Sequence, residues 1–328
     1  MQDDETGGMV WLVAVKGTFD ILVDGSLKIA DEQEPVHLVP EFKGESEERS
    51  SLLFDTDLVL NKPKVDLIIN GHAYAPNGEP AREVLTSVTI GEGADQYNKT
   101  LKVIGNRWWD RMLGIYFKTD PEPFTKMPIT YENAWGGVDE KVIDTVTKEP
   151  VYLPANPAGK GFAAKWAHWK GKPLPNVEYP KHPTKRRKKS NSVAGYSAVA
   201  YHWTPRAKWA GTYKDENYSK RPADFNPRFY NCAPEDQQIP REALLGGEAF
   251  SLRNLTPNGR LKFNLPKVEL SFNTYLNDKY VRHFGELHSI IIEPDFPRLL
   301  MIWQTSLACD GLEDRLEDSF ITHRMEYF

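Results

Sequence analysis

Short apolar runs separated by turn residues constrain the fold of this 328-residue chain more than any other feature. The runs are rich in β-branched and aromatic residues and are broken by proline, glycine and Asn-Gly or Asp-Gly pairs. This pattern is typical of β-strands joined by tight turns. Convincing helical periodicity is limited to residues 161–169 and 240–245, where a helix would have at most about three turns. The sequence therefore predicts a mainly β fold.

The apolar runs also predict where the strands lie. Residues 10–15 begin a strand, and Asp24 with Gly25 predicts a hairpin turn before residues 27–29. The other expected strands are residues 58–60, 65–69, 84–90, 101–104, 115–117, 196–203, 261–263, 268–272, 288–292 and 299–304. Their distribution favours two groups of strands, one near each end of the chain.

A weak internal repeat suggests that the two groups are related. Residues 63–67 resemble residues 266–270, and residues 85–90 then resemble residues 287–292 in the same order. A duplication and a chance likeness both stay open, because strands resemble one another through pleat and burial alone. We expect two β-sandwich-like halves, residues 1–135 and 195–328. A long irregular basic segment, residues 136–194, would join them.

The joining segment is rich in proline, lysine and tryptophan. Five adjacent cations, Lys-Arg-Arg-Lys-Lys at Lys185 to Lys189, repel one another, so we expect an exposed and mobile loop over residues 165–191. Nearby Trp166 and Trp169 offer stacking surfaces for nucleic acid. The net charge of the whole chain is −5, however, and this favours a solvated loop without nucleic acid.

Other patterns limit the class of protein. The acidic start lacks the basic and apolar regions of a secretory signal, and no apolar stretch approaches the ~18–20 residues that cross a bilayer. Cys232 and Cys309 are the only cysteines and lack C-x-x-C spacing, so we expect both to be reduced and buried. We expect a soluble, cytoplasmic protein that needs no cofactor.

Residues that could carry chemistry form no recognisable motif. His283 and His288 are the best metal candidates, but five residues apart on one strand they would face opposite sides. Cys309 could be a nucleophile with His202 or His323 as its base, although burial is the commoner role for such a cysteine. A glycosidase-like carboxylate pair stays open. Binding is therefore favoured over catalysis.

A proline-rich segment, residues 221–238, is the strongest candidate for a recognition surface. Its prolines at positions 222, 227 and 234 forbid a continuous helix or a central strand. Its side chains have the composition of interface hot spots, and we expect six of them to bind a partner protein: Phe225, Arg228, Phe229, Tyr230, Asp236 and Gln237. The alternative is that the aromatic side chains fill the core beneath a loop.

Over nearly its whole length the chain resembles the bacterial domain of unknown function family 2169. The resemblance rests on residues 11–19, 131–137 (Tyr-Glu-Asn-Ala-Trp-Gly-Gly), 156–161 (Asn-Pro-Ala-Gly-Lys-Gly), 203–206 and 211–213, and most specifically on residues 224–238.

The resemblance implies a cytoplasmic adaptor, or effector chaperone, of the bacterial type VI secretion system. Such an adaptor binds a toxic effector, often one with a PAAR-repeat tip, and helps to load it onto the valine-glycine-repeat spike. The family supplies no catalytic or ligand position. The alternative from another class is a carbohydrate-active enzyme or carbohydrate-binding module with a cleft lined by Trp108, Trp109 and Trp135.

Overall fold

The computed structural model describes residues 2–3, 8–93, 96–185, 191–213, 221–309 and 311–328. Within these ranges α1 (Thr204–Ala207) is the one α-helix. The other helical segments are short 3-10 turns: η1 (Glu47–Arg49), η2 (Pro76–Gly78), η3 (Tyr131–Asn133), η4 (Trp166–His168), η7 (Pro227–Tyr230), η8 (Glu235–Gln237), η9 (Arg241–Ala243) and η10 (Glu313–Arg315). The prediction of a mainly β protein is confirmed. Each expected helix contains only one 3-10 turn, η4 or η9.

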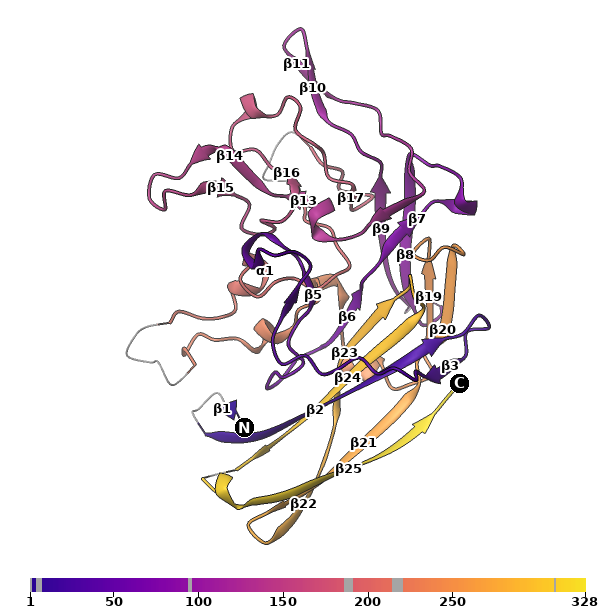
Figure 1. Cartoon of the computed structure of the whole chain (residues 1–328), viewed down its shortest axis with the longest axis vertical. Helices are drawn as coiled ribbons and strands as arrows, with labels where there is room; N and C mark the ends of the chain where they lie inside the picture. Colours follow the sequence, from indigo (N-terminus) through magenta and orange to yellow (C-terminus); the bar gives the residue numbers. More distant parts are fainter. Residues whose placement is uncertain (1, 4–7, 94–95, 186–190, 214–220, 310) are drawn as a thin grey trace.

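A seven-stranded sheet forms the centre of the molecule (Figure 1). Its order is β1 (Gln2–Asp3), β2 (Met9–Ile21), β24 (Arg298–Ala308), β23 (Glu286–Glu293), β6 (Val65–Ile69) and β18 (Gln238–Ile239), with β3 (Leu27–Ile29) also paired to β2. Only the β23–β6 pair within this sheet is parallel. The predicted hairpin turn before residues 27–29 is confirmed, with residues 19–21 of β2 paired to β3.

Two further sheets pack on one face of the central sheet. One has the order β17 (Val177–Glu178), β9 (Tyr97–Ile104), β8 (Glu83–Ile90), β19 (Ala249–Arg253) and β20 (Arg260–Asn264). The other has the order β22 (Lys279–Phe284), β21 (Lys267–Leu276) and β25 (Leu316–Glu326). Apolar side chains of all three sheets form one core cluster. The arrangement is therefore sandwich-like.

Irregular segments cover the opposite face of the central sheet. Strand β24 directs Leu299 and Met301 into the core between the sheets, and Leu300 and Ile302 into a second core with Trp203 and other side chains from these segments. Successive side chains of a strand point to opposite faces, so both sets are buried only because both faces are covered. This explains why the sequence of β24 is continuously apolar rather than alternating.

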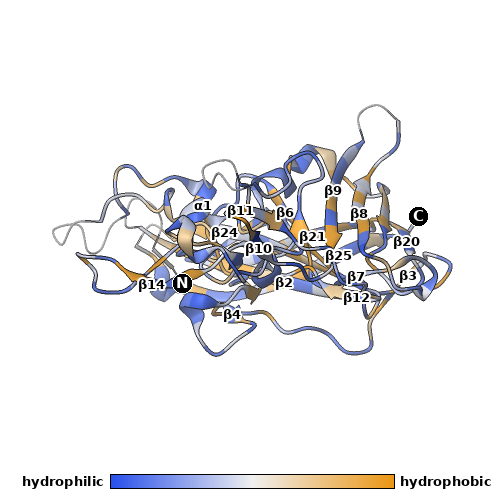
Figure 2. Cartoon of the chain, turned by 90° about the horizontal axis from the view of Figure 1, so that it is seen from above, coloured by the Kyte–Doolittle hydropathy of each residue, from blue (hydrophilic) through white to orange (hydrophobic). Residues whose placement is uncertain are grey.

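Five two-stranded pairs complete the described β structure. They are β4 (Glu41–Phe42) with β5 (Leu52–Phe54), β7 (His72–Tyr74) with β12 (Lys126–Pro128), β10 (Trp109–Met112) with β11 (Ile115–Lys118), β13 (Trp135–Gly136) with β16 (Lys160–Gly161), and β14 (Val138–Ile143) with β15 (Pro150–Tyr152). Figure 2 shows apolar residues concentrated on the strands at the middle of the molecule, with mostly hydrophilic loops at its rim. Among the described residues no helix has the length and apolarity needed to cross a membrane.

The structure differs from the expected division into residues 1–135, 136–194 and 195–328. Strands from the two expected halves pair with one another: β2 with β24, β6 with β23, and β8 with β19. The two segments of the first match in the proposed repeat, residues 63–67 and 266–270, also lie in different sheets. β6 is inside the central sheet and β21 is inside the three-stranded sheet. The likeness therefore reflects the common pleat and burial of strands, and the two ends of the chain form shared sheets.

The joining segment is also more ordered than expected. It contributes β14, β15, β16 and the edge strand β17, and it buries Trp169, Leu174 and Val177. Of the basic run, Lys185 is described and exposed, whereas positions 186–189 lie outside the described residues. Residues 58–60 and 196–203, expected as strands, are irregular instead. Their apolar side chains, Val59 and Tyr196 for example, are buried by tertiary packing without a sheet partner.

Candidate functional site

The recognition segment expected from the sequence is anchored from beneath by a buried carboxylate. Asp66, on β6, accepts hydrogen bonds from the backbone N–H groups of Cys232 (2.9 Å) and Ala233 (3.1 Å) and from Asn231 Nδ2 (2.9 Å). Lys62 Nζ lies 2.8 Å from the same carboxylate. Burial alone would raise the pKa of Asp66, but Lys62 and these hydrogen bonds hold it below its ordinary value. The carboxylate is therefore ionised and ties residues 231–233 to the central sheet.

Two of the six predicted binding residues are buried inside this arrangement. Gln237 Nε2 donates to the carbonyls of Leu67 (2.5 Å) and Tyr196 (2.9 Å), and the Gln237 side chain has no exposed surface. Tyr230 is 5% exposed, with the rings of Phe225 and Phe229 centred 5.4 and 6.2 Å away. For Tyr230 and Gln237 the structure corrects the prediction, because the prolines turn the chain so that these side chains point into the core.

Three others lie partly at the surface. Phe225 and Phe229 are half-buried with ring centroids 6.0 Å apart, and the Arg206 guanidinium lies over the Phe229 ring at 5.4 Å. Arg228 stacks over the indole of Trp209 at 4.2 Å and pairs with Glu235. These contacts hold the aromatic group in one conformation.

Arg228→Ala is expected to lower the free energy of unfolding by only about 1 kcal/mol, because the ion pair with Glu235 is partly exposed and stacking on Trp209 contributes little at the surface. Urea unfolding of the wild type, Arg228→Ala and Arg228→Lys measures this. A loss above about 3 kcal/mol, which is typical of truncating a large core side chain, would instead show that Arg228 belongs to the core.

Asp236, the sixth predicted residue, is exposed and stands at a junction of polar groups. Its carboxylate accepts from Lys99 Nζ (2.7 Å) and from the Tyr179 hydroxyl (2.9 Å), and its carbonyl accepts from the Tyr97 hydroxyl (2.7 Å). Burial lowers the pKa of Lys99 to about 8, although Asp236 favours the charged form. The junction therefore joins β9, the residue that follows β17 and the recognition segment.

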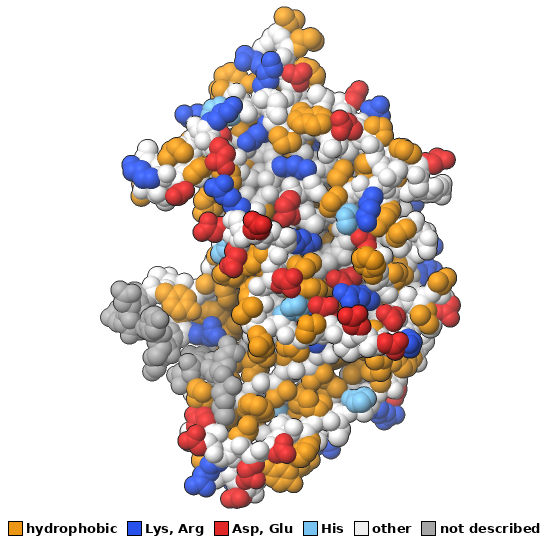
Figure 3. All heavy atoms as spheres, in the orientation of Figure 1, with side chains coloured by type: hydrophobic (Ala, Val, Ile, Leu, Met, Phe, Trp, Pro, Cys, Tyr) orange, Lys and Arg blue, Asp and Glu red, His pale blue; other side chains and the backbone are white. Residues whose placement is uncertain are grey.

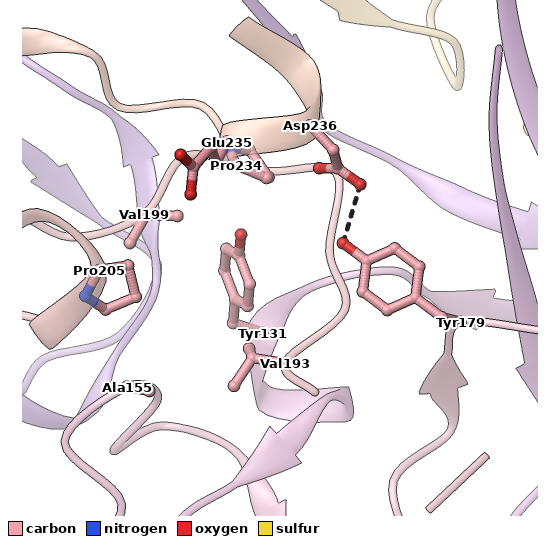
Figure 4. A pocket seen from close by; sticks show the side chains of 9 residues that line it. All are labelled: Tyr131, Ala155, Tyr179, Val193, Val199, Pro205, Pro234, Glu235 and Asp236. Carbon is pink, nitrogen blue, oxygen red and sulfur yellow. Dashed lines mark hydrogen bonds between the residues drawn. The ribbon is translucent and has the colours of Figure 1, made fainter. Parts of the chain in front are cut away.

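Two hollows share Tyr179 and Asp236 in their linings, and Figure 4 shows the first of them with the hydrogen bond between these two side chains. The first, of about 430 Å³, is mainly apolar and is lined by Tyr131, Ala155, Tyr179, Val193, Val199, Pro205, Pro234, Glu235 and Asp236. The second, of about 540 Å³, is lined by Leu85, Asn98, Lys99, Thr100, Tyr179, Pro180, Lys181, His182 and Asp236. We call the two hollows together the trough. Both parts offer apolar contact, and the second part adds the exposed cation of Lys181.

The motifs that carry the family resemblance build the wall of the first hollow. Tyr131 packs edge-on against buried Trp203 with ring centroids 5.4 Å apart. Asn156 Nδ2 donates to the carbonyls of Tyr131 (2.9 Å) and Trp135 (3.1 Å). Gly195 leaves the space for the Tyr131 ring, since a Cβ there would lie 2.5 Å from a ring carbon. The motif residues Trp203 and Asn156, together with Gly195, therefore position Tyr131.

Sequence reasoning found only Asp236 among the residues that line the trough. Tyr131 lay in a quoted motif without an assigned role, and Lys99 and Tyr179 were not singled out. Lys99 lies between polar Asn98 and Thr100, just before the expected strand 101–104, so no local signal marks it. No local signal marks Tyr179 either.

The tryptophans proposed for a carbohydrate cleft do not line one together. Trp109 is 4% exposed and packs on Trp169 with ring centroids 5.0 Å apart, and Trp135 is 2% exposed. A sugar needs an accessible ring face, which buried indoles do not offer. The prediction of this cleft was wrong, because the indoles of Trp109 and Trp135 fill the protein interior.

The candidate catalytic and metal residues lie in separate elements. Cys309 follows β24 and is buried, as is Cys232, which confirms the expected burial of both cysteines. His202 lies in an irregular segment and His323 on β25.

His283 and His288 belong to β22 and β23, yet both line one hollow of about 340 Å³. The expectation that they face opposite sides of one strand fails, since Gly285 separates two strands. The described residues contain no group of three or more His, Cys, Asp and Glu side chains suited to a metal ion.

Comparison with known families gives one match. A family model described as "Uncharacterized protein conserved in bacteria (DUF2169)" matches residues 6–304. No curated protein and no solved structure matches the chain. The matched range includes the whole trough and ends within β24, so β25 lies beyond it.

Proposed function

The chain belongs to the bacterial family DUF2169, and from that premise we propose that it is a cytoplasmic adaptor that binds a type VI secretion effector and helps to load it onto the valine-glycine-repeat spike. The observation that carries this proposal is the trough. Its first hollow is lined by side chains suited to hold an apolar segment of another protein, namely Tyr131, Val193, Val199, Pro205 and Pro234. An effector that exposes apolar segments before export needs such a binding site.

The walls of the trough are held in place before a partner arrives. Asp66 and Gln237 anchor the segment that carries Pro234, Glu235 and Asp236. Binding to a rigid site loses less side-chain and loop entropy than binding to a mobile one. This rigidity supports recognition of a specific partner.

The chemistry of the trough also limits the effector segment that fits. Apolar side chains of an extended segment would enter the first hollow. In the second hollow the exposed ammonium group of Lys181 suits an acidic side chain or a terminal carboxylate. The donors of Lys99, Asn98 and Thr100 in this hollow already bond to other groups of the chain. Arg228 adjoins the trough through its ion pair with Glu235, so part of the predicted surface borders the site.

Filling the first hollow is expected to abolish most effector binding. Ala155 lines this hollow and is only partly buried, so Ala155→Trp should occupy it without disturbing the core. We expect about thirtyfold weaker binding, or ~2 kcal/mol, as for the loss of one hot-spot contact. Ala167→Trp adds the same volume at an exposed position of η4, outside the lining of the trough, and is the matched control.

The measurement is immunoprecipitation of the tagged chain from its own bacterium, followed by mass spectrometry and by a secretion assay for the captured effector. The proposal requires that the wild type and Ala167→Trp capture a type VI effector, that Ala155→Trp does not, and that deletion of the adaptor gene stops secretion of that effector. Normal secretion after deletion, or equal capture by the two variants, would contradict it.

A further inference from the structure

Strand β25 (Leu316–Glu326) leaves a long sheet edge open. It is 11 residues long, most of its side chains are exposed, and among the described strands it pairs only with β21. An edge of this length presents unpaired N–H and C=O groups, and proteins usually protect such edges with proline, lysine, a bulge or a covering element. β25 contains neither proline nor lysine, and its one register irregularity lies at its first residues. The outer edge is therefore suited to pair with another strand.

The opposite edge of the same sheet is different. Strand β22 carries Lys279 and Arg282, and His283 Nδ1 lies 2.7 Å from Thr305 Oγ1 of β24. Lysine on this edge and the neighbouring strand β24 hinder pairing along β22. We therefore expect β25, and not β22, to be the edge that pairs with another strand.

The charges along β25 are complementary to those of a second copy in antiparallel orientation. Acidic Glu317 and Asp318 stand near its start, His323 and Arg324 stand near its end, and Ile321 lies between them. If Ile321 of one copy faces Ile321 of the other, Asp318 of each copy stands opposite Arg324 of its partner. Both residues lie on the same face of the strand, because an even number of positions separates them. Opposite charges directly across a strand pair stabilise it, and a two-fold axis produces this contact twice.

The side chains needed for this pairing are accessible. The Arg324 side chain is 76% exposed, and its present ion-pair partner, Glu326 at 2.9 Å, lies on the same strand. Phe320 and Ile321 are 54% and 46% exposed, so the centre of the edge is apolar. Figure 3 shows apolar side chains gathered over the lower part of the molecule, where Figure 1 draws β2, β25 and β22. Pairing would remove part of this apolar surface from water.

We propose that two copies of this chain associate by antiparallel pairing of their β25 strands, which joins two three-stranded sheets into one six-stranded sheet. Parallel pairing in register would instead place Asp318 beside Asp318 and Arg324 beside Arg324. The exposed aromatic residues of each sheet, Tyr275, Tyr280, Phe284 and Phe320, would form one continuous face across the dimer, because register pairing places them on the same side. This inference does not depend on the adaptor function.

The test is sedimentation equilibrium of the full chain, of Asp318→Arg, of Arg324→Asp and of the double variant. The wild type should be a dimer at micromolar concentration. Each single charge reversal should weaken dimerisation about tenfold or more, because like charges then face one another twice. The double variant should dimerise like the wild type, and so should an equimolar mixture of the two single variants, in which every opposed pair is again attractive.

Thermal melting checks that the variants stay folded, which their exposed positions favour. A monomeric wild type, single variants that dimerise as tightly as the wild type, or a mixture that stays monomeric would each overturn the proposal. Binding of an unrelated protein by the β25 edge of a monomeric chain would overturn it as well.

Discussion

Replacing Asp66 with alanine is expected to lower the free energy of unfolding by about 3–5 kcal/mol, the usual cost of breaking a buried ion pair. Asp66 has no exposed surface and Lys62 is 3% exposed, so the buried ammonium group would lose its counter-ion and keep the hydroxyl of Ser289, 2.8 Å away, as a partner. Asp66 raises the pKa of Lys62 although burial opposes this, which shows that the charged state of Lys62 depends on its partner. The same substitution removes the acceptor for the N–H groups of Cys232 and Ala233.

Urea unfolding of Asp66→Ala and of the double variant Lys62→Met, Asp66→Leu separates these two effects. The double variant carries no charge at positions 62 and 66, so its stability should be higher than that of Asp66→Ala. It should still be about 1–3 kcal/mol less stable than the wild type, because the N–H groups lack an acceptor. The anchoring role would be contradicted if the unfolding free energy of Asp66→Ala lay within about 1 kcal/mol of the wild-type value, as is usual for surface substitutions. A partial loss of effector binding should accompany the loss of stability, since the anchored segment forms one wall of the trough.

Lowering the pH from 7 to 4 is expected to cost about 3 kcal/mol of stability through His288 alone. Burial, with Lys62 and Arg241 nearby, lowers the pKa of His288 to about 3, whereas an unfolded histidine has a pKa of about 6.5. Above pH 6.5 both states are neutral. Between pH 6.5 and 3 only the unfolded chain binds the proton, so stability falls by about 1.4 kcal/mol for each pH unit.

The measurement compares the wild type with His288→Gln, because glutamine is polar but does not titrate in this range. The difference in unfolding free energy between pH 7 and pH 4 should be about 3 kcal/mol smaller in His288→Gln, as carboxylates contribute equally to both proteins. Parallel pH profiles for the two proteins would show that His288 is protonated in the folded state.

The positions of the strands were largely predictable because they depend on neighbouring residues. Residues 65–69, 84–90 and 299–304 combine β-branched side chains with nearby turn residues, and each became part of a strand. The run 196–203 is also apolar but is irregular: Tyr196 lies in the core between the sheets and Trp203 in the second core, although the run joins no sheet. The residue composition of a run therefore predicts that its side chains are buried more reliably than it predicts that the run pairs with a neighbouring strand.

The candidate site was predicted only in part. The prolines of residues 221–238 correctly indicated a shaped, packed excursion, and Asp236 is exposed on it. Whether Gln237 faces inward could not be predicted locally, since its side-chain amide bonds to the carbonyls of Leu67 and Tyr196, far away in the sequence.

The amino-acid sequence by itself determined the mainly β class, the first hairpin and the family, because each depends on local turn chemistry or on motifs within a few residues. Tertiary structure alone decided that β2 pairs with β24 and β6 with β23. It also decided that Lys99, Tyr179 and Asp236 meet between two hollows. Such contacts join segments far apart along the chain, and a strand's apolar pattern specifies that a face is buried without specifying which surface buries it.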